Sequence, residues 1–329
     1  MGDVAPARPG EAGAATATTA TAATAAATRV DQAVGSFAGR LRRRETTLLD
    51  GGLGSLLIAR GLPAGVPPES WVEARPGEVV KAHADYVAAG SDAVHAVTFG
   101  ANPVRLARFG LAERCEEVNA SAVRLARESG ARFVLADVGP TGEYLPPVGS
   151  GDREAWREAF LRQARALAAA APDALHVETM TDLREALVAL EALREGAPSL
   201  PVMVSMTFER KKRGFFTIMG DPLAASLRAL AAAGADAVGA NCSVTSADML
   251  SLAREARAAV ELPLVLQPNA GLPGPGGGAG AYAQAPEAFA DEMAAVAAEG
   301  VEMVGGCCGT DPRFILELGK RLARPGGRS

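Results

Sequence analysis

Residues 301–310 read Val-Glu-Met-Val-Gly-Gly-Cys-Cys-Gly-Thr, and the interpretation of the whole chain starts from this stretch. A short apolar run ends in two glycines, which are followed by two adjacent cysteines and a third glycine. Because glycine has no side chain, the backbone can turn sharply beside the thiols, and a ligand can approach them closely. The stretch therefore predicts a strand whose carboxyl end presents Cys307 and Cys308.

Seven earlier apolar runs have the same form, and each is followed by a stretch with helical periodicity. The predicted strands cover residues 47–50, 92–98, 132–137, 174–178, 201–206, 236–241, 262–267 and 301–305. The predicted helices cover residues 77–89, 103–129, 153–171, 182–195, 222–233, 247–259, 286–299 and 313–323. This alternation predicts a (β/α)8 TIM barrel, in which all strands place their carboxyl ends at one mouth. An open doubly wound sheet is the alternative, but residues 51–54, Gly-Gly-Leu-Gly, lack the glycine spacing of a dinucleotide-binding turn.

The chain divides into a tail at residues 1–36 and a single barrel domain at residues 37–329. Between Ala14 and Thr28 only alanine and threonine occur, so this tail has no large apolar side chains to bury and is predicted to be disordered. The run of three arginines at 42–44 is interpreted as a solvated face or a helix end, and nucleic-acid binding is the less favoured alternative.

Composition excludes several classes of function. The 329 residues include 33 basic and 38 acidic side chains, so neither nucleic acid nor an anionic membrane is expected as a partner. No apolar run approaches the roughly 20 residues that span a bilayer, and no basic and apolar leader is present, so a cytoplasmic location is expected. Four cysteines in a chain of this length do not make a disulfide scaffold, and clustered thiols in a reducing compartment are more often metal ligands or reactive groups.

The sixth and eighth predicted strands should bring three thiols together at the mouth. Cys242 directly follows the sixth strand, as Cys307 and Cys308 follow the eighth. Zinc takes thiolate ligands at about 2.3 Å, and catalytic zinc usually has three protein ligands and one open position. The three cysteines fill three positions and predict a zinc site that is open to a substrate.

No fourth protein ligand is evident for this zinc. Cys115 lies within a predicted helix, and we interpret it as a core residue. His83 and His95 fall within the second strand–helix unit, and His176 lies inside the fourth strand. Two other interpretations of the adjacent cysteines stay open, namely a redox-active vicinal disulfide and a pair of buried thiols without function.

A thiolate-rich zinc suits a soft incoming ligand such as a substrate thiol. Coordination deprotonates a thiol, and the thiolate is the nucleophilic form of sulfur. The predicted reaction type is therefore alkyl transfer to a thiol. Hydrolysis is less favoured because hydrolytic zinc sites use histidine and carboxylate ligands, with water at the open position.

The motifs together resemble the zinc-dependent homocysteine S-methyltransferase family. The resemblance extends from about Thr46 to about Leu322, and it is specific because the motifs occur in the family's order. The matching segments are Asp50-Gly51-Gly52-Leu53-Gly54-Ser55, Thr98-Phe99-Gly100-Ala101-Asn102, Glu178-Thr179, Asn241-Cys242, Pro268-Asn269-Ala270-Gly271 and Gly305-Gly306-Cys307-Cys308-Gly309-Thr310 with downstream Pro312.

The resemblance implies both a metal centre and a substrate site. It implies a Zn²⁺ ion held by Cys242, Cys307 and Cys308. It also implies that homocysteine is the substrate, with its amino group held by Glu178 and by the turn that contains Asp50. An ammonium group favours a carboxylate partner, and a glycine turn offers backbone carbonyl groups. The full set of substrate-binding residues implied in this way is Asp50, Gly51, Gly52, Glu178, Thr179 and Asn241.

The segment at residues 136–142, Ala-Asp-Val-Gly-Pro-Thr-Gly, looks like the homocysteine module of cobalamin-dependent methionine synthase. A methylated corrinoid on a separate protein is therefore the expected methyl donor, since no cobalamin or folate module is expected in this chain. Gly100 stands where betaine enzymes carry a tyrosine, which counts against betaine. The apolar segment 214–220 departs from the synthase pattern and either docks a donor protein or packs its own loop. The glycine-rich loop 274–280 is expected to be mobile.

Other donors and functions stay open at this point. S-methylmethionine or betaine could supply the methyl group, or the acceptor could be another thiol. Demethylation of a methylated amine through a corrinoid protein would use the same barrel and zinc. The alternative outside enzymology is a barrel that senses thiols or metals through Cys307 and Cys308.

Overall fold

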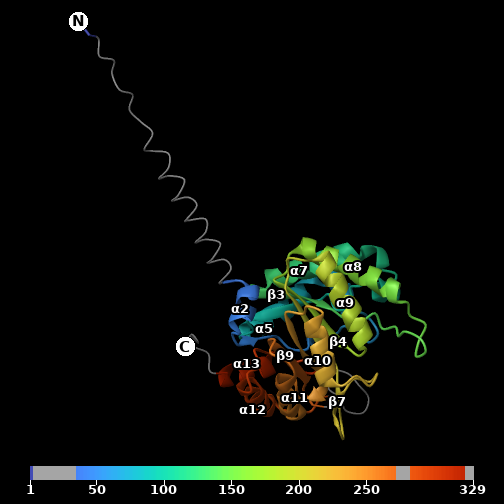
Figure 1. The fold of residues 1–329 in the computed structure, drawn as a ribbon, viewed down its shortest axis with the longest axis vertical. Coiled ribbons are helices and arrows are strands. Elements are labelled where there is room, and N and C mark those ends of the chain that lie inside the picture. Colours follow the sequence, from blue (N-terminus) through green and yellow to red (C-terminus); the bar gives the residue numbers. More distant parts are fainter. Residues whose placement is uncertain (3–34, 272–281, 323–329) are drawn as a thin grey trace.

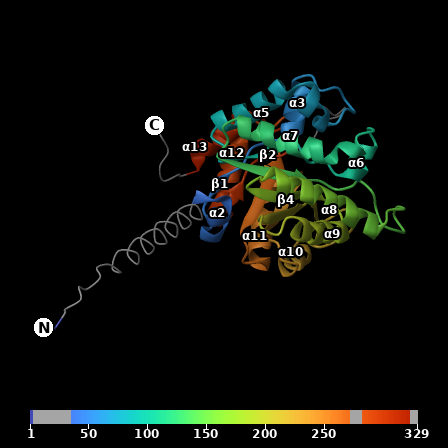
Figure 2. The same cartoon turned by 90° about the horizontal axis from the view of Figure 1, so that it is seen from above.

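The computed structural model describes residues 1–2, 35–271 and 282–322. Most of the predicted tail at 1–36 lies outside these residues, and so does the predicted loop at 274–280. Within the described residues the chain alternates between strands and helices, and the helices surround a central parallel sheet (Figure 1; Figure 2).

The sheet has eight parallel strands in the order β1-β10-β9-β8-β5-β4-β3-β2. The strands are β1 (Thr47–Leu48), β2 (Ala93–Ala96), β3 (Phe133–Val138), β4 (Ala174–Met180), β5 (Val202–Met206), β8 (Ala237–Thr245), β9 (Leu264–Asn269) and β10 (Met303–Val304). Strands β1 and β2 meet at the seam, where the Asp92 amide donates to the Leu48 carbonyl at 2.7 Å and the Asp92 carboxylate accepts from the Leu48 amide at 2.9 Å. The predicted (β/α)8 TIM barrel is confirmed.

The helices follow the strands in the predicted alternation. They are α2 (Phe37–Arg43), α3 (Leu53–Ala59), α4 (Trp71–Ala74), α5 (Pro76–Ala88), α6 (Pro103–Ala107), α7 (Cys115–Glu128), α8 (Arg153–Ala170), α9 (Leu183–Gly196), α10 (Leu223–Ala232), α11 (Ser246–Ala259), α12 (Pro286–Ala298) and α13 (Pro312–Arg321). Several begin at side-chain caps, because Asp152 accepts from the Ala155 amide and Asp182 from the Arg184 amide. These caps satisfy amides that have no partner within the helix.

Apolar side chains form two layers. The larger layer lies between the strands and the surrounding helices and contains, for example, Trp156 and Phe160, both 0% exposed. The smaller layer fills the barrel interior and includes Leu49, Leu135, Met203, Val265 and Met303. Helix α2 closes this interior, because Phe37 packs edge-on against Phe133 with ring centroids 5.5 Å apart.

The predicted helix at 103–129 is wrong, because the chain forms three pieces there. Helix α6 ends at Ala107, a 3₁₀ turn covers Ala112–Arg114, and α7 begins at Cys115. Gly110 adopts a positive φ of 71°, which breaks the helical backbone between α6 and the turn. Cys115 therefore begins a helix instead of lying in the middle of one. It is 0% exposed and belongs to a small apolar cluster, which confirms its predicted place in the core.

The apolar segment 214–220 forms part of a hairpin that the sequence did not predict. Strands β6 (Glu209–Lys211) and β7 (Gly214–Phe216) pair antiparallel after β5. Phe215 is 2% exposed, whereas Ile218 is 67% exposed. The segment thus packs its own loop through one side chain and presents another to solvent. None of the helices in the described residues is long and apolar enough to cross a membrane.

Candidate active site

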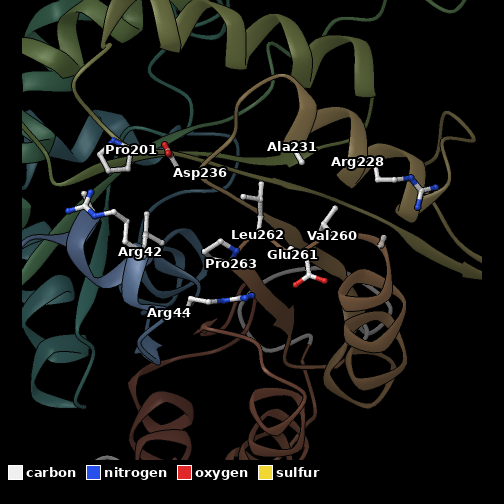
Figure 3. A pocket seen from close by; sticks show the side chains of 13 residues that line it. Arg42, Arg44, Pro201, Arg228, Ala231, Asp236, Val260, Glu261, Leu262 and Pro263 are labelled. Carbon is white, nitrogen blue, oxygen red and sulfur yellow. The ribbon is translucent and has the colours of Figure 1, made fainter.

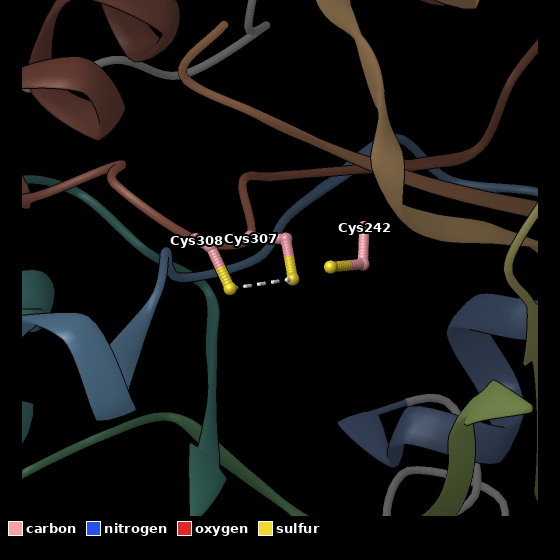
Figure 4. Close-up of side chains that lie close together, drawn as sticks. All are labelled: Cys242, Cys307 and Cys308. Atoms are coloured by element: carbon pink, nitrogen blue, oxygen red, sulfur yellow. Dashed lines mark hydrogen bonds between the residues drawn. The ribbon is translucent and has the colours of Figure 1, made fainter. Parts of the chain in front are cut away.

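Three cysteines meet at the carboxyl ends of β8 and β10. The sulfur atoms of Cys242, Cys307 and Cys308 all lie within 4.8 Å of one another, and those of Cys307 and Cys308 are 4.0 Å apart (Figure 4). No disulfide joins them, since all three are free thiols. Residues separated by more than 60 positions in the chain are thus brought within reach of one ion, as the strand order predicted.

Backbone hydrogen bonds fix the two adjacent cysteines. The Cys307 amide donates to the Pro268 carbonyl at 2.8 Å, and the Cys308 amide donates to the Asn269 side chain at 3.1 Å. The Thr310 hydroxyl donates to the Cys307 carbonyl at 2.6 Å. Because the bonds come from β9 and from the turn itself, both sulfur atoms are held at the mouth before any ligand binds.

Cys242 lies on a distorted part of β8. The pairing register with β9 shifts between Asn241 and Thr245, and Cys242 and Ser243 have φ angles of 60° and 48°. Left-handed backbone at residues other than glycine is uncommon and often marks functional positions. Here it turns the Cys242 sulfur out of the strand and toward the other two thiols (Figure 4).

The three thiols fit a tetrahedral metal. Sulfur ligands at about 2.3 Å from one ion lie about 3.8 Å apart, close to the 4.0 Å between Cys307 and Cys308. Hydrogen bonds from the Cys307 and Cys308 thiols lower the pKa of Cys242 to about 3, so one thiolate is already favoured. A site with three cysteines and no histidine suits zinc or another soft cation.

Strand β4 places Glu178 and Thr179 beside the thiols, and β8 places Asn241 there. The Asn241 Oδ1 accepts from the Thr179 amide at 2.7 Å, which orients the amide nitrogen toward the cavity. That nitrogen lies 3.3 Å from a Glu178 oxygen and 3.9 Å from the Cys307 sulfur. Asn241 therefore joins the acidic part of the site to the thiols.

Asp50 is fully buried and bonded to a residue that was not predicted to be in the site. Its Oδ2 accepts from the backbone amide of His95 at 2.8 Å, and its Oδ1 lies 2.6 Å from His95 Nδ1. His95 Nε2 is 3.0 Å from His176 Nδ1, and His176 Nε2 is 3.0 Å from the Ser205 hydroxyl. Ser205 in turn donates to Asn241 at 2.9 Å, so a continuous chain of hydrogen bonds crosses the barrel.

Burial and neighbouring charges shift the acid–base behaviour of this chain. Burial lowers the pKa of His95, but Asp137 and Asp50 outweigh that effect and raise it to about 10. Burial also raises the pKa of Glu178 to about 7, and it raises the pKa of Asp137 well above its usual range. His176 stays neutral because burial and the charge on His95 lower its pKa.

A cavity of about 340 Å³ joins the thiols to the acidic residues. Of the predicted site residues its walls include Gly51, Gly52, Glu178, Thr179, Cys242, Cys307 and Cys308. Asp50 and Asn241 lie behind the wall, and both are 0% exposed. The lining residues that the predicted site did not include are, among others, Glu69, His95, Phe99 and Asp137. The two-residue spacing of His176 and Glu178 on one strand was a signal that both side chains face inward.

A larger cavity of about 640 Å³ lies at the opposite end of the barrel, between α2 and residues that precede β5, β8 and β9 (Figure 3). Among the described residues, its walls contain neither cysteine nor histidine. Two of its charged groups are already paired, because Arg44 bonds Glu302 at 2.6 Å and Asp236 bonds Arg194 at 2.6 Å. Barrel enzymes place their chemistry at the other end, so we assign the site to the smaller cavity.

Comparison with known proteins identifies the family. The family model described as homocysteine S-methyltransferase matches residues 47–322, which include every strand of the barrel and all three clustered thiols. The chain belongs to the homocysteine S-methyltransferase family.

Curated relatives of this homocysteine S-methyltransferase family member include two methionine synthases. The protein from Mycobacterium tuberculosis is 33% identical over 264 residues, which cover 76% of this chain and 22% of that protein. The protein from Mycobacterium leprae is 31% identical over 265 residues, covering 77% of this chain and 22% of its own length. The chain thus spans about a fifth of the length of these relatives.

Solved structures of a homocysteine methyltransferase, MmuM from Escherichia coli, have the same fold. The metallated form matches with a TM-score of 0.70 and 26% identity, over 86% of this chain and 98% of that one. The oxidised form matches with a TM-score of 0.71 and 25% identity, over 84% and 96%. That the similar enzyme has a metallated form agrees with the cluster of three thiols found here.

Proposed function

We propose that this protein transfers a methyl group to the sulfur of L-homocysteine and so forms L-methionine. The observation that carries the proposal is the meeting of Cys242, Cys307 and Cys308 in the cavity that also contains Glu178. One side of the cavity offers thiols that suit a soft metal, and the other offers a carboxylate that suits a positively charged group. Homocysteine has both complementary groups, a thiol and an ammonium group.

The three cysteines would hold a zinc ion and leave one position open for the substrate. Zinc, when bound, lowers the pKa of a coordinated thiol and keeps it as a nucleophilic thiolate at neutral pH. The protein residues then fix where that sulfur lies. Asn241 holds its amide toward Cys307 and Glu178, which orients the two ends of the site relative to each other.

Glu178 and the turn at Gly51 and Gly52 are proposed to bind the amino group of homocysteine. Glu178 lines the cavity, and its side chain is 15% exposed, so one carboxylate oxygen is accessible to a substrate. A carboxylate in a buried site binds an ammonium group through short, charge-assisted hydrogen bonds. A direct role for Asp50 stays a prediction, because both of its oxygens contact His95.

The reaction needs positioning more than proton transfer. The sulfur–carbon bond forms as the bond between the methyl group and its carrier breaks, and the carrier leaves with that electron pair. No protein acid or base is required, because the thiolate has already lost its proton. The protein contributes by holding the thiolate in line with the methyl group and by keeping bulk water from the cavity.

We propose a methylated corrinoid, carried by a separate protein, as the methyl donor. The segment at 136–142 supports this choice because it resembles methionine synthase, and the curated relatives carry that name. S-methylmethionine is the second candidate, since MmuM is a homocysteine methyltransferase of similar fold. A cytoplasmic location stays part of this proposal.

The proposal is tested by metal analysis and by product analysis together. The purified protein should contain one zinc per chain and form methionine from homocysteine with methylcobalamin, S-methylmethionine or betaine. Cys307→Ala should lose the zinc and at least about 100-fold in rate, since even partners of metal ligands affect metal affinity 10–100-fold. Cys115→Ala is the matched control because Cys115 is buried away from the cluster.

Two results would contradict the proposal. One is wild-type protein that binds no zinc after incubation with the metal. The other is a Cys307→Ala variant that forms methionine at the rate of the Cys115→Ala control.

A further inference from the structure

A chain of hydrogen bonds crosses the barrel, and the proposed function gives no role to its middle members. It runs from Asp50 through His95, His176 and Ser205 to Asn241. All five side chains are buried, and neither His176 nor Ser205 lines the cavity. Buried polar groups are stable only when they are hydrogen-bonded, so the contacts fix which atoms of this chain carry protons.

The direction of the chain is decided at Asn241. Its Oδ1 lies 2.7 Å from the backbone nitrogen of Thr179, which can only donate, and so this side-chain atom is the oxygen. The Ser205 hydroxyl lies 2.9 Å from the same oxygen. An amide oxygen has no proton to give, so Ser205 donates to Asn241.

The positions of the remaining protons follow in order. Ser205 has used its one proton, so it accepts from His176 Nε2 at 3.0 Å. Burial and the charge on His95 lower the pKa of His176 and keep that ring neutral. Its Nδ1 therefore accepts from His95 Nε2 at 3.0 Å. His95 Nδ1 lies 2.6 Å from Asp50 Oδ1, so both ring nitrogens of His95 are donors, in agreement with its raised pKa of about 10.

Because its oxygen is held in this way, the Asn241 amide nitrogen faces the acceptors of the site. It lies 2.7 Å from the Thr179 hydroxyl, 3.3 Å from a Glu178 oxygen and 3.9 Å from the Cys307 sulfur. If the amide were reversed, its oxygen would face these acceptors and repel a thiolate. An N–H group beside a thiolate instead stabilises the negative charge. The orientation of Asn241 should therefore affect how tightly the thiols bind a metal.

We propose that His176 and Ser205 are positioning residues for the three thiols, and that they act by holding the N–H group of Asn241 toward Cys307. Protonated His95 keeps the chain in this direction. A neutral His95 could accept from His176 Nδ1, and Ser205 would then donate to His176. The oxygen of Asn241 would lose one of its two donors. The inference rests on the proposed function, since it assumes that the thiols bind zinc.

The first test measures the direction of the chain. The protein has three histidines, so nuclear magnetic resonance of ¹⁵N-labelled histidine rings can resolve each of them. At about pH 7.5, His95 should carry protons on both ring nitrogens, and His176 should be neutral with its proton on Nε2. His176→Gln assigns the signals of that ring. A proton on His176 Nδ1 would overturn the inference, because Ser205 would then donate away from Asn241.

The second test measures the affinity of the full chain for zinc by competition with a chromophoric chelator. Ser205→Ala should weaken zinc binding by about 10-fold, at the low end of the range for partners of metal ligands. Ser205→Thr keeps the hydroxyl and should restore most of the affinity. Ser226→Ala is the matched control, since the Ser226 hydroxyl is also buried but donates to the Pro222 carbonyl and does not belong to the chain or the cavity.

A double-mutant cycle separates positioning from a general effect on stability. If Ser205 acts through Asn241, Ser205→Ala should cause no further loss of zinc affinity in an Asn241→Leu background. A loss that persists in that background would overturn the inference, and so would Ser205→Ala protein that binds zinc as tightly as the Ser226→Ala control. The proposed function would survive both results, because the wild-type protein still binds zinc.

Two remaining outcomes have a definite meaning. Wild-type protein that binds no zinc would contradict the proposed function, and the inference with it. If Ser205→Ala does not fold, the resonance measurement still decides the inference, because it needs no variant of Ser205.

Discussion

Single glycines decide whether the thiols can reach their positions. A Cβ at residue 306 would overlap the Thr310 hydroxyl and lie 2.6 Å from the Thr310 Cβ. Thr310 cannot move away freely, because its hydroxyl donates to the Cys307 carbonyl and accepts from the Gly52 amide. The space beside Cys307 therefore accommodates the backbone of residue 306 but no side chain.

Gly306→Ala should accordingly destabilise the protein by about 1–3 kcal/mol, the usual cost of overpacking a buried position, and weaken zinc binding. The measurements are the free energy of unfolding in denaturant and the zinc content after dialysis. Gly77→Ala is the control, because a Cβ at 77 meets no other atom within 4 Å and alanine suits a helix. If both variants keep full stability and zinc, the close packing around residue 306 is not needed.

His95 predicts a pH dependence of stability with a definite sign. Asp137 and Asp50 raise its pKa to about 10 in the folded protein, above the ordinary value of 6.5. The stabilisation of the folded protein by protonated His95 is therefore complete below about pH 6.5 and is lost as the pH rises through 10. Between pH 7.5 and 9 the unfolding free energy should fall by about 2 kcal/mol, at 1.36 kcal/mol for each unit.

The test compares wild type with His95→Gln in urea titrations across that range. The variant is expected to be less stable at pH 7.5 but to lose less stability on the way to pH 9. Parallel pH profiles for the two proteins would rule out a charged His95.

At the scale of secondary structure, the pair of β8 and β9 is the element on which the site depends. Gly239 lies in β8, and a Cβ there would overlap the Val265 carbonyl oxygen of β9. The same strand continues to Asn241 and Cys242. Close approach of these two backbones therefore sets the position of Cys242, a proposed metal ligand, and of the Asn241 amide that faces it.

Gly239→Ala should separate the two strands and destabilise the protein by about 3 kcal/mol or more, at the upper end of overpacking effects. Any folded fraction should bind zinc weakly because Cys242 is displaced. Thermal unfolding followed by circular dichroism, with zinc content measured in parallel, provides the test. Wild-type melting and wild-type zinc content would contradict the importance of this contact.

The sequence predicted the strands well because each is a compact apolar run that ends in polar or small residues. It predicted helix boundaries less well where glycine acts locally, as at Gly110, which divides the predicted helix at 103–129. The short helices α2, α3 and α4 were missed because four to seven residues carry little periodicity. Tertiary contacts hold such elements in place more than their own propensity does.

The cysteine cluster was predictable because the carboxyl ends of all strands in a barrel share one mouth, and only β9 lies between β8 and β10. The hydrogen-bond chain from Asp50 to Asn241 was not, because its links join residues 29 to 81 positions apart whose side chains meet only through strand register. The spacing to Glu178 indicates the inward direction of His176, but whether His95 faces inward depends on a single-residue shift in its strand. The sequence gives no local sign of their contact.

At the scale of the whole molecule, the proposed metal site and the apolar core are separate. The two large apolar clusters contain none of the three clustered cysteines, and helix α2 closes the barrel at the far end through Phe37. The three cysteines connect segments at the mouth of the barrel and do not pack against the strands below. Zinc should therefore contribute to the order of the site and little to the fold.

Removal of zinc by a chelator should lower the melting temperature modestly while far-ultraviolet circular dichroism and cooperative unfolding are retained. Structural zinc sites behave in the opposite way, since their domains unfold without the metal. The measurement is a thermal scan before and after chelation, followed by addition of zinc to restore the first curve. Loss of the native spectrum on chelation would show that the fold itself needs the metal.

The left-handed backbone at Thr179, Cys242 and Ser243 has an evolutionary consequence. Each such residue costs on the order of 1–3 kcal/mol relative to a relaxed backbone, and glycine would relieve that strain. Ser243 could be replaced by glycine during evolution while Cys242 keeps its thiol. A change of Cys242 to glycine would relieve strain and increase stability, but it would remove a thiol that the proposed reaction needs. Homologues that are no longer selected for catalysis should therefore replace Cys242 early and keep a stable barrel fold without activity.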